Sequence, residues 1–201
     1  MIIIGLTGGI ASGKSTVSKE LRSMGVPIYD ADEASRLAVA KGSPALEQVA
    51  AVFGKEYLTD DGELNRPKVA ELVLNDVEAR AKLEAIIHKI VWQGAEDFLS
   101  QCRKEQQPMA VLDVPLLIEC GWHKRVDSVW LVSVSKELQV KRGLQRGGIS
   151  RENLLARIEA QMSLEEKSQV ADVILDNSGT LEDILVQVHQ QVRLIKDEDE
   201  K

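Results

Sequence analysis

The N-terminal segment constrains this chain most, because a β-branched run leads there into a glycine-rich turn and then into a helical pattern. Residues 8–15, Gly-Gly-Ile-Ala-Ser-Gly-Lys-Ser, match G-x-x-x-x-G-K-[ST] at every fixed position. Between a strand and a helix, this pattern predicts a loop whose backbone N–H groups point at phosphate oxygens, backed by the positive end of the helix. We therefore expect the chain to bind the phosphates of a nucleoside triphosphate.

The polar residues of this loop have predicted roles of their own. Lys14 is expected to reach the β- and γ-phosphates, and the hydroxyl of Ser15 is expected to bind Mg²⁺. A plain glycine turn that Ser12 or Ser15 caps is the structural alternative. The strand–loop–helix context favours the phosphate loop over that alternative.

Composition excludes several other classes of protein. With 201 residues and 44% hydrophobic content, the chain can bury one sizeable core, with room for an inserted subdomain. The net charge of -7 and the 3% aromatic content argue against a nucleic-acid partner. Cys102 and Cys120 form no CxxC pattern, so we expect reduced thiols. The N-terminal apolar run is too short for a membrane span and no basic residues precede it, which predicts a cytoplasmic protein without a membrane partner.

Strand and helix patterns alternate along most of the chain. Strands are expected at Ile2–Thr7, Val26–Asp30, Ala110–Val114, Ser128–Ser133 and Val173–Asp176. Helical patterns separate them, which predicts an α/β fold with a parallel sheet and helices on both faces. Residues 42–106 carry almost only helical pattern, so a helical insert is expected at the carboxyl edge of the sheet, where such sheets bind ligands.

Other segments narrow the class of phosphate-loop protein. The guanine-reading N-K-x-D of GTP switches does not occur, and the segment at 113–116, Asp-Val-Pro-Leu, is not a D-x-x-G. The strand "AVLD" ends in one acid rather than in the Asp-Glu of large ATPases. A small kinase remains, and such an enzyme needs a base, an acceptor pocket and a cationic lid.

The candidate base follows the second expected strand, in the segment "YDADEASR". A carboxylate of Asp30 or Asp32 would stand at the sheet edge that carries the phosphate loop, where it could take the proton of an acceptor hydroxyl. Aspartate is also a preferred N-cap, and Asp32 precedes a helical pattern. The spacing alone leaves both roles open for Asp32.

The candidate lid is the cationic stretch 136–157, which holds six Lys or Arg residues and two Glu, a net charge of +4. Arg142 and Arg146 are four residues apart and share a helix face. Gly147-Gly148 is expected to end that helix, and Ser150 to cap the next. A helical lid over the triphosphate is therefore predicted, with a solvated helical hairpin as the alternative.

Several segments together resemble the dephospho-CoA kinase family over nearly the whole chain. They are "GLTGGIASGKST", "DAD" at 30–32, "SPAL", "DDGELNR" at 60–66, "DVPLLIE" at 113–119, "QVKRGLQR" at 139–146, "RIEAQ" at 157–161 and "ADVILDNSGT" at 171–180. The combination of "DAD", "VPLLIE" and "ADVILDNSG" is far more selective than the phosphate loop.

The resemblance implies a P-loop kinase-type fold with a five-stranded parallel sheet. Its nucleotide-binding core would comprise 1–41, 107–135 and 158–201, its helical acceptor insert 42–106 and its lid 136–157. The implied reaction is ATP-dependent phosphorylation of the 3′-hydroxyl of dephospho-CoA to CoA and ADP. Another small-molecule or nucleoside kinase, and a nucleotide-dependent switch, are the alternatives, and the chain is expected as a monomer or small homo-oligomer.

The resemblance also implies roles for single residues. It makes Asp32 the general base and places Arg142 and Arg146 on the triphosphate. The implied ATP-binding residues are Gly8, Gly9, Ala11, Ser12, Gly13, Lys14, Ser15, Thr16 and, near the adenine, Asn177. For Mg²⁺ the candidates are Ser15 and Asp113, the latter through water or else in a structural hydrogen bond. For dephospho-CoA the candidates are Asp32, Arg66 and His88; helix capping is the alternative for Arg66, and an ordinary helix position for His88.

Two positions depart from the family's usual pattern. Ala11 stands where the family has glycine, and its methyl group is expected to do little harm because φ is expected to stay negative. Lys89 stands where the family has proline after His88, so the helix there is expected to continue.

Overall fold

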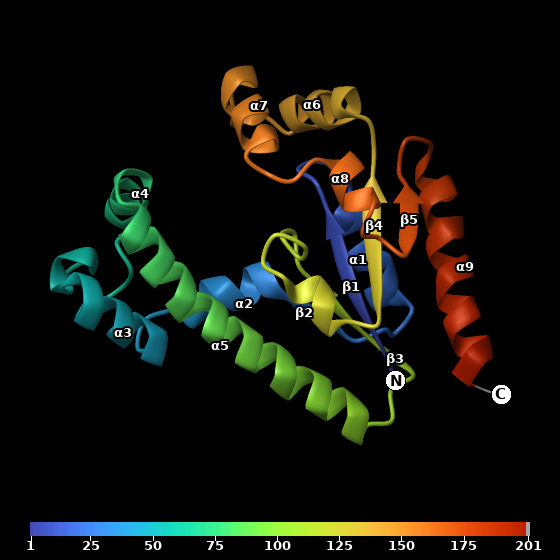
Figure 1. Cartoon of the computed structure of the whole chain (residues 1–201), viewed down its shortest axis with the longest axis horizontal. Coiled ribbons are helices and arrows are strands. Elements are labelled where there is room, and N and C mark those ends of the chain that lie inside the picture. Colours follow the sequence, from blue (N-terminus) through green and yellow to red (C-terminus); the bar gives the residue numbers. More distant parts are fainter. Residues whose placement is uncertain (200–201) are drawn as a thin grey trace. The chain divides into compact units, whose positions relative to one another are not determined.

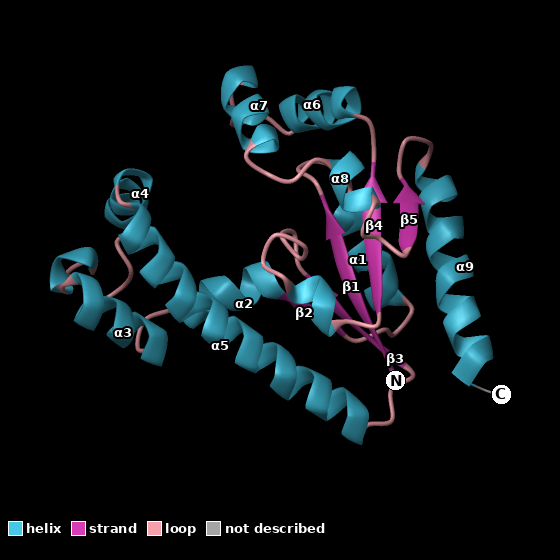
Figure 2. Ribbon diagram, viewed as in Figure 1, coloured by secondary structure: helices cyan, strands magenta, loops and turns pink. Residues whose placement is uncertain are grey.

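The computed structural model describes residues 1–199 (Figure 1, Figure 2). Contacts within the chain divide it into two compact units, Met1–Tyr29 with Gln101–Lys201, and Asp30–Ser100. Each unit has a hydrophobic cluster of its own. No helix in residues 1–199 is both long and apolar enough to cross a membrane.

The first unit is built on a five-stranded sheet in the order β2-β3-β1-β4-β5. The strands are β1 (Ile2–Gly8), β2 (Ile28–Asp30), β3 (Met109–Asp113), β4 (Ser128–Ser133) and β5 (Val173–Asp176). β1 pairs in parallel with β3 and β4, and β4 pairs in parallel with β5. The parallel sheet is confirmed, and all five strands lie within two residues of their predicted starts. Every residue of β3 is buried, as expected for a strand that is covered on both faces.

Two helices cover one face of this sheet. These are α1 (Lys14–Ser23) and α9 (Leu181–Asp199). Leu21 of α1 and Val188 of α9 join Leu175 of β5 in one buried cluster. Because side chains alternate along a strand, the neighbouring Ile174 faces the other side, where it lines a cavity together with Leu164 of α8 (Leu164–Ser168). Helices therefore lie on both faces of the sheet, as the sequence predicted.

The cationic stretch forms two helices, α6 (Lys136–Gln145) and α7 (Arg151–Glu159). Gly147 and Gly148 separate them and have φ angles of 72° and 76°, which glycine adopts without strain. The Ser150 hydroxyl caps α7 by accepting a hydrogen bond from the Asn153 N–H at 3.2 Å. A methyl group at Gly143 would lie 2.6 Å from Leu154, so the two helices pack closely. Two helices separated at the glycine pair are therefore present as predicted, and their action as a lid stays a prediction.

The second unit is helical. It holds α2 (Ala31–Ala38), α3 (Pro44–Phe53), the 3-10 turn η1 (Lys55–Tyr57), α4 (Arg66–Asn75) and most of α5 (Val77–Lys104). Val49, Val69 and Leu83 form its buried cluster. α5 runs for 28 residues and continues past His88 and Lys89, as expected in the absence of proline. The functional division at residues 42 and 106 stays a prediction, since the compact unit begins earlier and ends earlier.

Candidate active site

The phosphate loop lies between the end of β1 and the start of α1. Gly13, with φ of 97°, is the N-cap of α1, and among the described residues no side chain caps this helix. Its first turn also contains no acidic residue. The alternative in which Ser12 or Ser15 caps the helix is therefore wrong. An uncapped helix N-terminus leaves N–H groups for an anion, which is what a phosphate site requires.

Ala11 adopts a left-handed backbone conformation with φ of 57°. The expectation that its φ stays negative was wrong. The tight curl of the loop requires left-handed residues at positions 11 and 13, and glycine occupies only the second of them. An L-residue in this region costs roughly 1–2 kcal/mol, so strain is stored inside the loop.

Two side-chain amides contact the outside of the loop. Nε2 of Gln139 donates to the Ile10 carbonyl oxygen at 2.8 Å, and Nδ2 of Asn177 donates to the Ser12 carbonyl oxygen at 2.8 Å. Gln139 and Asn177 are 5% and 8% exposed, so both bonds are shielded from water. The place near the adenine that the resemblance implies for Asn177 stays a prediction, and its side-chain amide contacts the loop.

The same contacts explain two of the loop glycines. A β-carbon at Gly9 would collide with the amide of Gln139, and one at Gly13 would collide with the amide of Asn177. Sequence reasoning missed Gln139. The available signal was the glutamine that begins "QVKRGLQR", one of the segments that carry the resemblance, in which only the arginines received a role.

Lys14 forms an ion pair with Asp113, whose other carboxylate oxygen accepts a hydrogen bond from Ser18 Oγ. Asp113 ends β3 and is the register partner of Leu6 in β1, so the sheet brings these two strand ends together. Asp113 is 3% exposed, and burial of its charge is offset by the two partners. The structural role foreseen for Asp113 is thus present, which leaves its action on Mg²⁺ as a proposal.

The loop has the features that a triphosphate requires. Ser12 Oγ is buried and has no hydrogen-bond partner within residues 1–199, and such a group is typical of a ligand site. Lys14 supplies a cation, and Ser15 is exposed in the first turn of α1, where its hydroxyl is accessible to a metal ion. The described residues contain no group of three or more His, Cys, Asp or Glu side chains that could hold a metal ion.

The two arginines predicted for the lid differ in their contacts. Nη2 of Arg142 donates to the Asn177 carbonyl oxygen at 2.9 Å. Arg146 is the C-cap of α6 and is exposed, and no described side chain pairs with its guanidinium group. Arg142 is therefore linked to the loop through Asn177, whose side-chain amide donates to the Ser12 carbonyl oxygen, whereas Arg146 is exposed to solvent.

The substrate candidates lie in the second unit. Asp30, not Asp32, caps α2, because its carboxylate accepts a hydrogen bond from the Glu33 N–H at 3.0 Å. The capping alternative for Asp32 is therefore wrong, and Asp32 is an exposed residue in the first turn. Arg66 is the exposed first residue of α4, which Asn65 caps, and His88 is exposed on α5.

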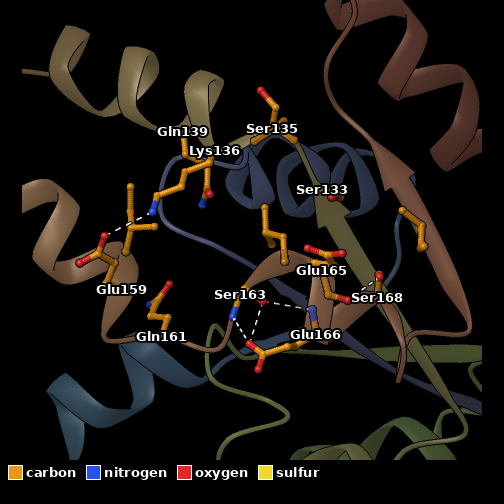
Figure 3. A pocket seen from close by; sticks show the side chains of 14 residues that line it. Ser133, Ser135, Lys136, Gln139, Glu159, Gln161, Ser163, Glu165, Glu166 and Ser168 are labelled. Carbon is orange, nitrogen blue, oxygen red and sulfur yellow. Dashed lines mark hydrogen bonds and ion pairs between the residues drawn. The ribbon is translucent and has the colours of Figure 1, made fainter.

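A cavity of about 710 Å³ is lined by residues of α6, α7 and α8, Gln139 among them (Figure 3). Two of its lining residues, Lys136 and Glu159, form an ion pair at 3.3 Å. Two others, Ser163 and Glu166, form a capping box that starts α8. The Ser163 hydroxyl, followed by the Ser163 N–H, lowers the pKa of the Glu166 carboxyl group.

Helix α8 also carries a fully buried lysine that the sequence analysis missed. Lys167 is 0% exposed, pairs with Glu119 at 2.9 Å and donates to the Pro115 carbonyl oxygen at 3.0 Å. Thr7 Oγ1 donates to the same carbonyl at 2.9 Å. These bonds give the segment "VPLLIE" a structural role. Pro115 and Glu119 link the turn after Asp113 to α8 through Lys167, and Pro115 also links it to β1 through Thr7.

A family model and several relatives of this chain share one description. The family model for dephospho-CoA kinase matches residues 2–183. The chain belongs to the dephospho-CoA kinase family. Dephospho-CoA kinase of Carboxydothermus hydrogenoformans is 44% identical over 186 residues, covering 92% of this chain and 90% of that protein. The Geobacter sulfurreducens enzyme is 45% identical over 184 residues, with 92% and 93% covered.

Solved structures agree with this assignment. A Thermus thermophilus protein has a TM-score of 0.85 and 39% identity, covering 96% of each chain. Dephospho-CoA kinase from Campylobacter jejuni has a TM-score of 0.74 and 26% identity, covering 98% of each. As a member of the dephospho-CoA kinase family the chain is a phosphotransferase, and membership of a kinase family implies use of ATP.

Proposed function

We propose that this chain transfers the γ-phosphoryl group of ATP to the 3′-hydroxyl of dephospho-CoA, giving CoA and ADP in the last step of coenzyme A biosynthesis. The observation that carries the proposal is the N-terminus of α1, which no described side chain caps and which follows a loop with left-handed residues at Ala11 and Gly13. The match of residues 2–183 to the dephospho-CoA kinase family model supports it. The two free cysteines are compatible with work in the cytoplasm, where ATP is available.

We assign the ATP phosphates to the loop residues 8–16. The N–H groups at the start of α1 and the Lys14 ammonium would hold the β- and γ-phosphates. Mg²⁺, when bound, neutralises charge on the phosphate oxygens. Ser15 is the residue that we propose as its direct ligand, with Asp113 acting through water.

We assign proton abstraction to Asp32. Asp32 is exposed in the first turn of α2, the helix that Asp30 caps, and a carboxylate has the chemistry to accept the proton of the 3′-hydroxyl. Arg66 and His88 are proposed for contacts with dephospho-CoA, within an acceptor insert at 42–106. Arg142 and Arg146 of the lid at 136–157 would stabilise the charge that spreads over the equatorial oxygens, because guanidinium groups suit phosphate geometry.

ADP release measured with ATP and a panel of acceptors tests the proposal. Dephospho-CoA should stimulate release strongly, whereas AMP, shikimate and uridine should give at most background. Lack of stimulation by dephospho-CoA would rule the proposal out. Tight ATP binding with no stimulation by any acceptor would instead indicate a nucleotide-dependent switch.

A further inference from the structure

The two left-handed residues of the phosphate loop are held in the same way. Ala11 has φ of 57° and Gly13 has φ of 97°. The carbonyl group just before Ala11 accepts a hydrogen bond from Gln139 Nε2, and the one just before Gly13 accepts a hydrogen bond from Asn177 Nδ2, each at 2.8 Å. Each left-handed residue thus follows a peptide group whose orientation a buried side chain fixes.

Fixing these carbonyl groups also fixes the N–H groups of the same peptides. In a trans peptide the C=O and N–H bonds point in opposite directions. A carbonyl of Ile10 directed outward to Gln139 therefore directs the Ala11 N–H inward, and Asn177 does the same for the Gly13 N–H. In the part of the chain that the structure describes, no hydrogen bond uses either of these two N–H groups. Inward N–H groups of this kind form an anion-binding nest.

One helix connects both contacts. Gln139 lies in α6, and so does Arg142, whose guanidinium group donates to the Asn177 carbonyl oxygen at 2.9 Å. Residues three apart share one face of a helix, so this face of α6 contacts the loop directly through Gln139 and indirectly through Asn177. The first lid helix and the phosphate loop therefore form one hydrogen-bonded assembly.

We propose that Gln139 and Asn177 are positioning residues, which turn the N–H groups of Ala11 and Gly13 toward the phosphate chain before the nucleotide binds. The proposal rests on the proposed binding of ATP phosphates by the loop. The two side-chain amides contact the loop backbone, and in this proposal they take no part in recognising the adenine of ATP. Their effect should accordingly be the same on ATP and on inorganic tripolyphosphate, which lacks adenine.

The test compares Gln139→Leu, Asn177→Leu and a control, Gln190→Leu. Gln190 is exposed on α9 and has no described hydrogen bond. Each loop variant loses one buried donor, so its Kd for tripolyphosphate and for ATP should rise about tenfold. The Kd for dephospho-CoA should stay within about twofold of the unsubstituted value, as should all constants of the control.

The double variant adds a second measurement. Because both side chains act on one loop, Gln139→Leu with Asn177→Leu should weaken tripolyphosphate binding by clearly less than the product of the two single effects. If Gln139→Leu does not fold, Gln139→Met replaces it, since methionine is uncharged and unbranched like glutamine and its thioether donates no hydrogen bond.

Several outcomes would overturn the positioning role. One is an unchanged affinity for tripolyphosphate in both loop variants. Another is a loss of dephospho-CoA affinity as large as the loss of tripolyphosphate affinity. The third is weaker binding of ATP while tripolyphosphate binds as tightly as before. Lys14→Ala separates this failure from failure of the proposed site. If Lys14→Ala abolishes tripolyphosphate binding while Gln139→Leu leaves it intact, the positioning role alone is wrong; if Lys14→Ala also binds normally, the site itself is wrong.

Discussion

The side chain of Lys14, in the first turn of α1, forms an ion pair with Asp113 at the end of β3, 99 residues further along the chain. The parallel pairing of β1 with β3 brings the two together at the carboxyl edge of the sheet. The loop cation is therefore held beside the proposed phosphate site by a buried carboxylate.

Asp113→Asn should show whether this carboxylate serves Mg²⁺ as well as Lys14. An amide can still accept the hydrogen bond of Ser18, but it carries no charge to attract a hydrated cation. We expect the Mg²⁺ concentration for half-maximal turnover to rise about tenfold. Titration of ADP release against Mg²⁺ measures this, with Asp97→Asn on the exposed surface of α5 as control. An unchanged Mg²⁺ dependence would restrict Asp113 to its structural contacts.

Ala11→Gly should stabilise the protein, which is unusual for a change to glycine. Glycine adopts φ of 57° without the steric cost that alanine carries, although it loses more backbone entropy on folding. We expect the free energy of unfolding to rise by about 0.5–1 kcal/mol. Urea denaturation measures it.

Ala81→Gly is the matched control for that change. Ala81 is exposed inside α5, where glycine should lower the free energy of unfolding by about 0.5–1 kcal/mol. A loss of stability in Ala11→Gly equal to that of the control would show that position 11 carries no strain.

Asp32→Asn should remove turnover and leave ATP affinity unchanged. If Asp32 accepts the proton of the acceptor hydroxyl, its amide cannot replace it, and kcat should fall by about 10²–10⁴. Asp30→Asn is the matched control, since asparagine caps a helix as well as aspartate does. Single-turnover kinetics with ATP and dephospho-CoA measure both variants. Near-normal turnover in Asp32→Asn, or an equal loss in both, would remove the base assignment.

Arg146→Ala and Arg142→Ala should differ in their effects on kcat and on Tm. Arg146 is exposed and unpaired within residues 1–199, so its loss should lower kcat by about a hundredfold with almost no change in Tm. Arg142 also holds the Asn177 carbonyl, so its loss should lower both kcat and Tm. Thermal melts and initial rates measure the two effects.

Arg193→Ala serves as the control for the variants of Arg142 and Arg146, because Arg193 is exposed on α9 and its side chain pairs only with Asp197 among the residues that the structure describes. It should change neither kcat nor Tm. If Arg146→Ala behaves like this control, the lid role falls on Arg142 alone.

The elements of this fold that local patterns determine were predicted well. Continuous apolar runs predicted the buried strands, and glycine pairs and serine caps predicted where α6 ends and α7 begins. The phosphate loop was predicted because its residues are neighbours in the sequence. The cap of α2 was not predicted correctly: the sequence analysis considered Asp32 as the cap, whereas Asp30 occupies that position, because the backbone angles at the helix start decide which aspartate caps it.

The contacts that support the loop could not be read in this way. Gln139 reaches Ile10 across 129 positions, and Lys167 reaches Pro115 across 52. Nothing local distinguishes Gln139 from the solvent-facing residues of a charged helix, or Lys167 from the other charges of "LEEKS". Their burial follows only when α6 and α8 pack beside the loop.

The sequence by itself predicted the parallel α/β sheet from alternating strand and helix patterns, and Lys14 and Ser15 as phosphate-site residues from the short-range spacing of one motif. It indicated the family through the resemblance of segments along nearly the whole chain. The tertiary structure decided the conformation of Ala11 and the pairing of Lys14 with Asp113. It also decided the hydrogen bonds that Gln139 and Asn177 donate to carbonyl groups of the loop. These depend on groups that are distant in the chain and close in space, and the sign of φ at position 11 depends on the closed loop as a whole.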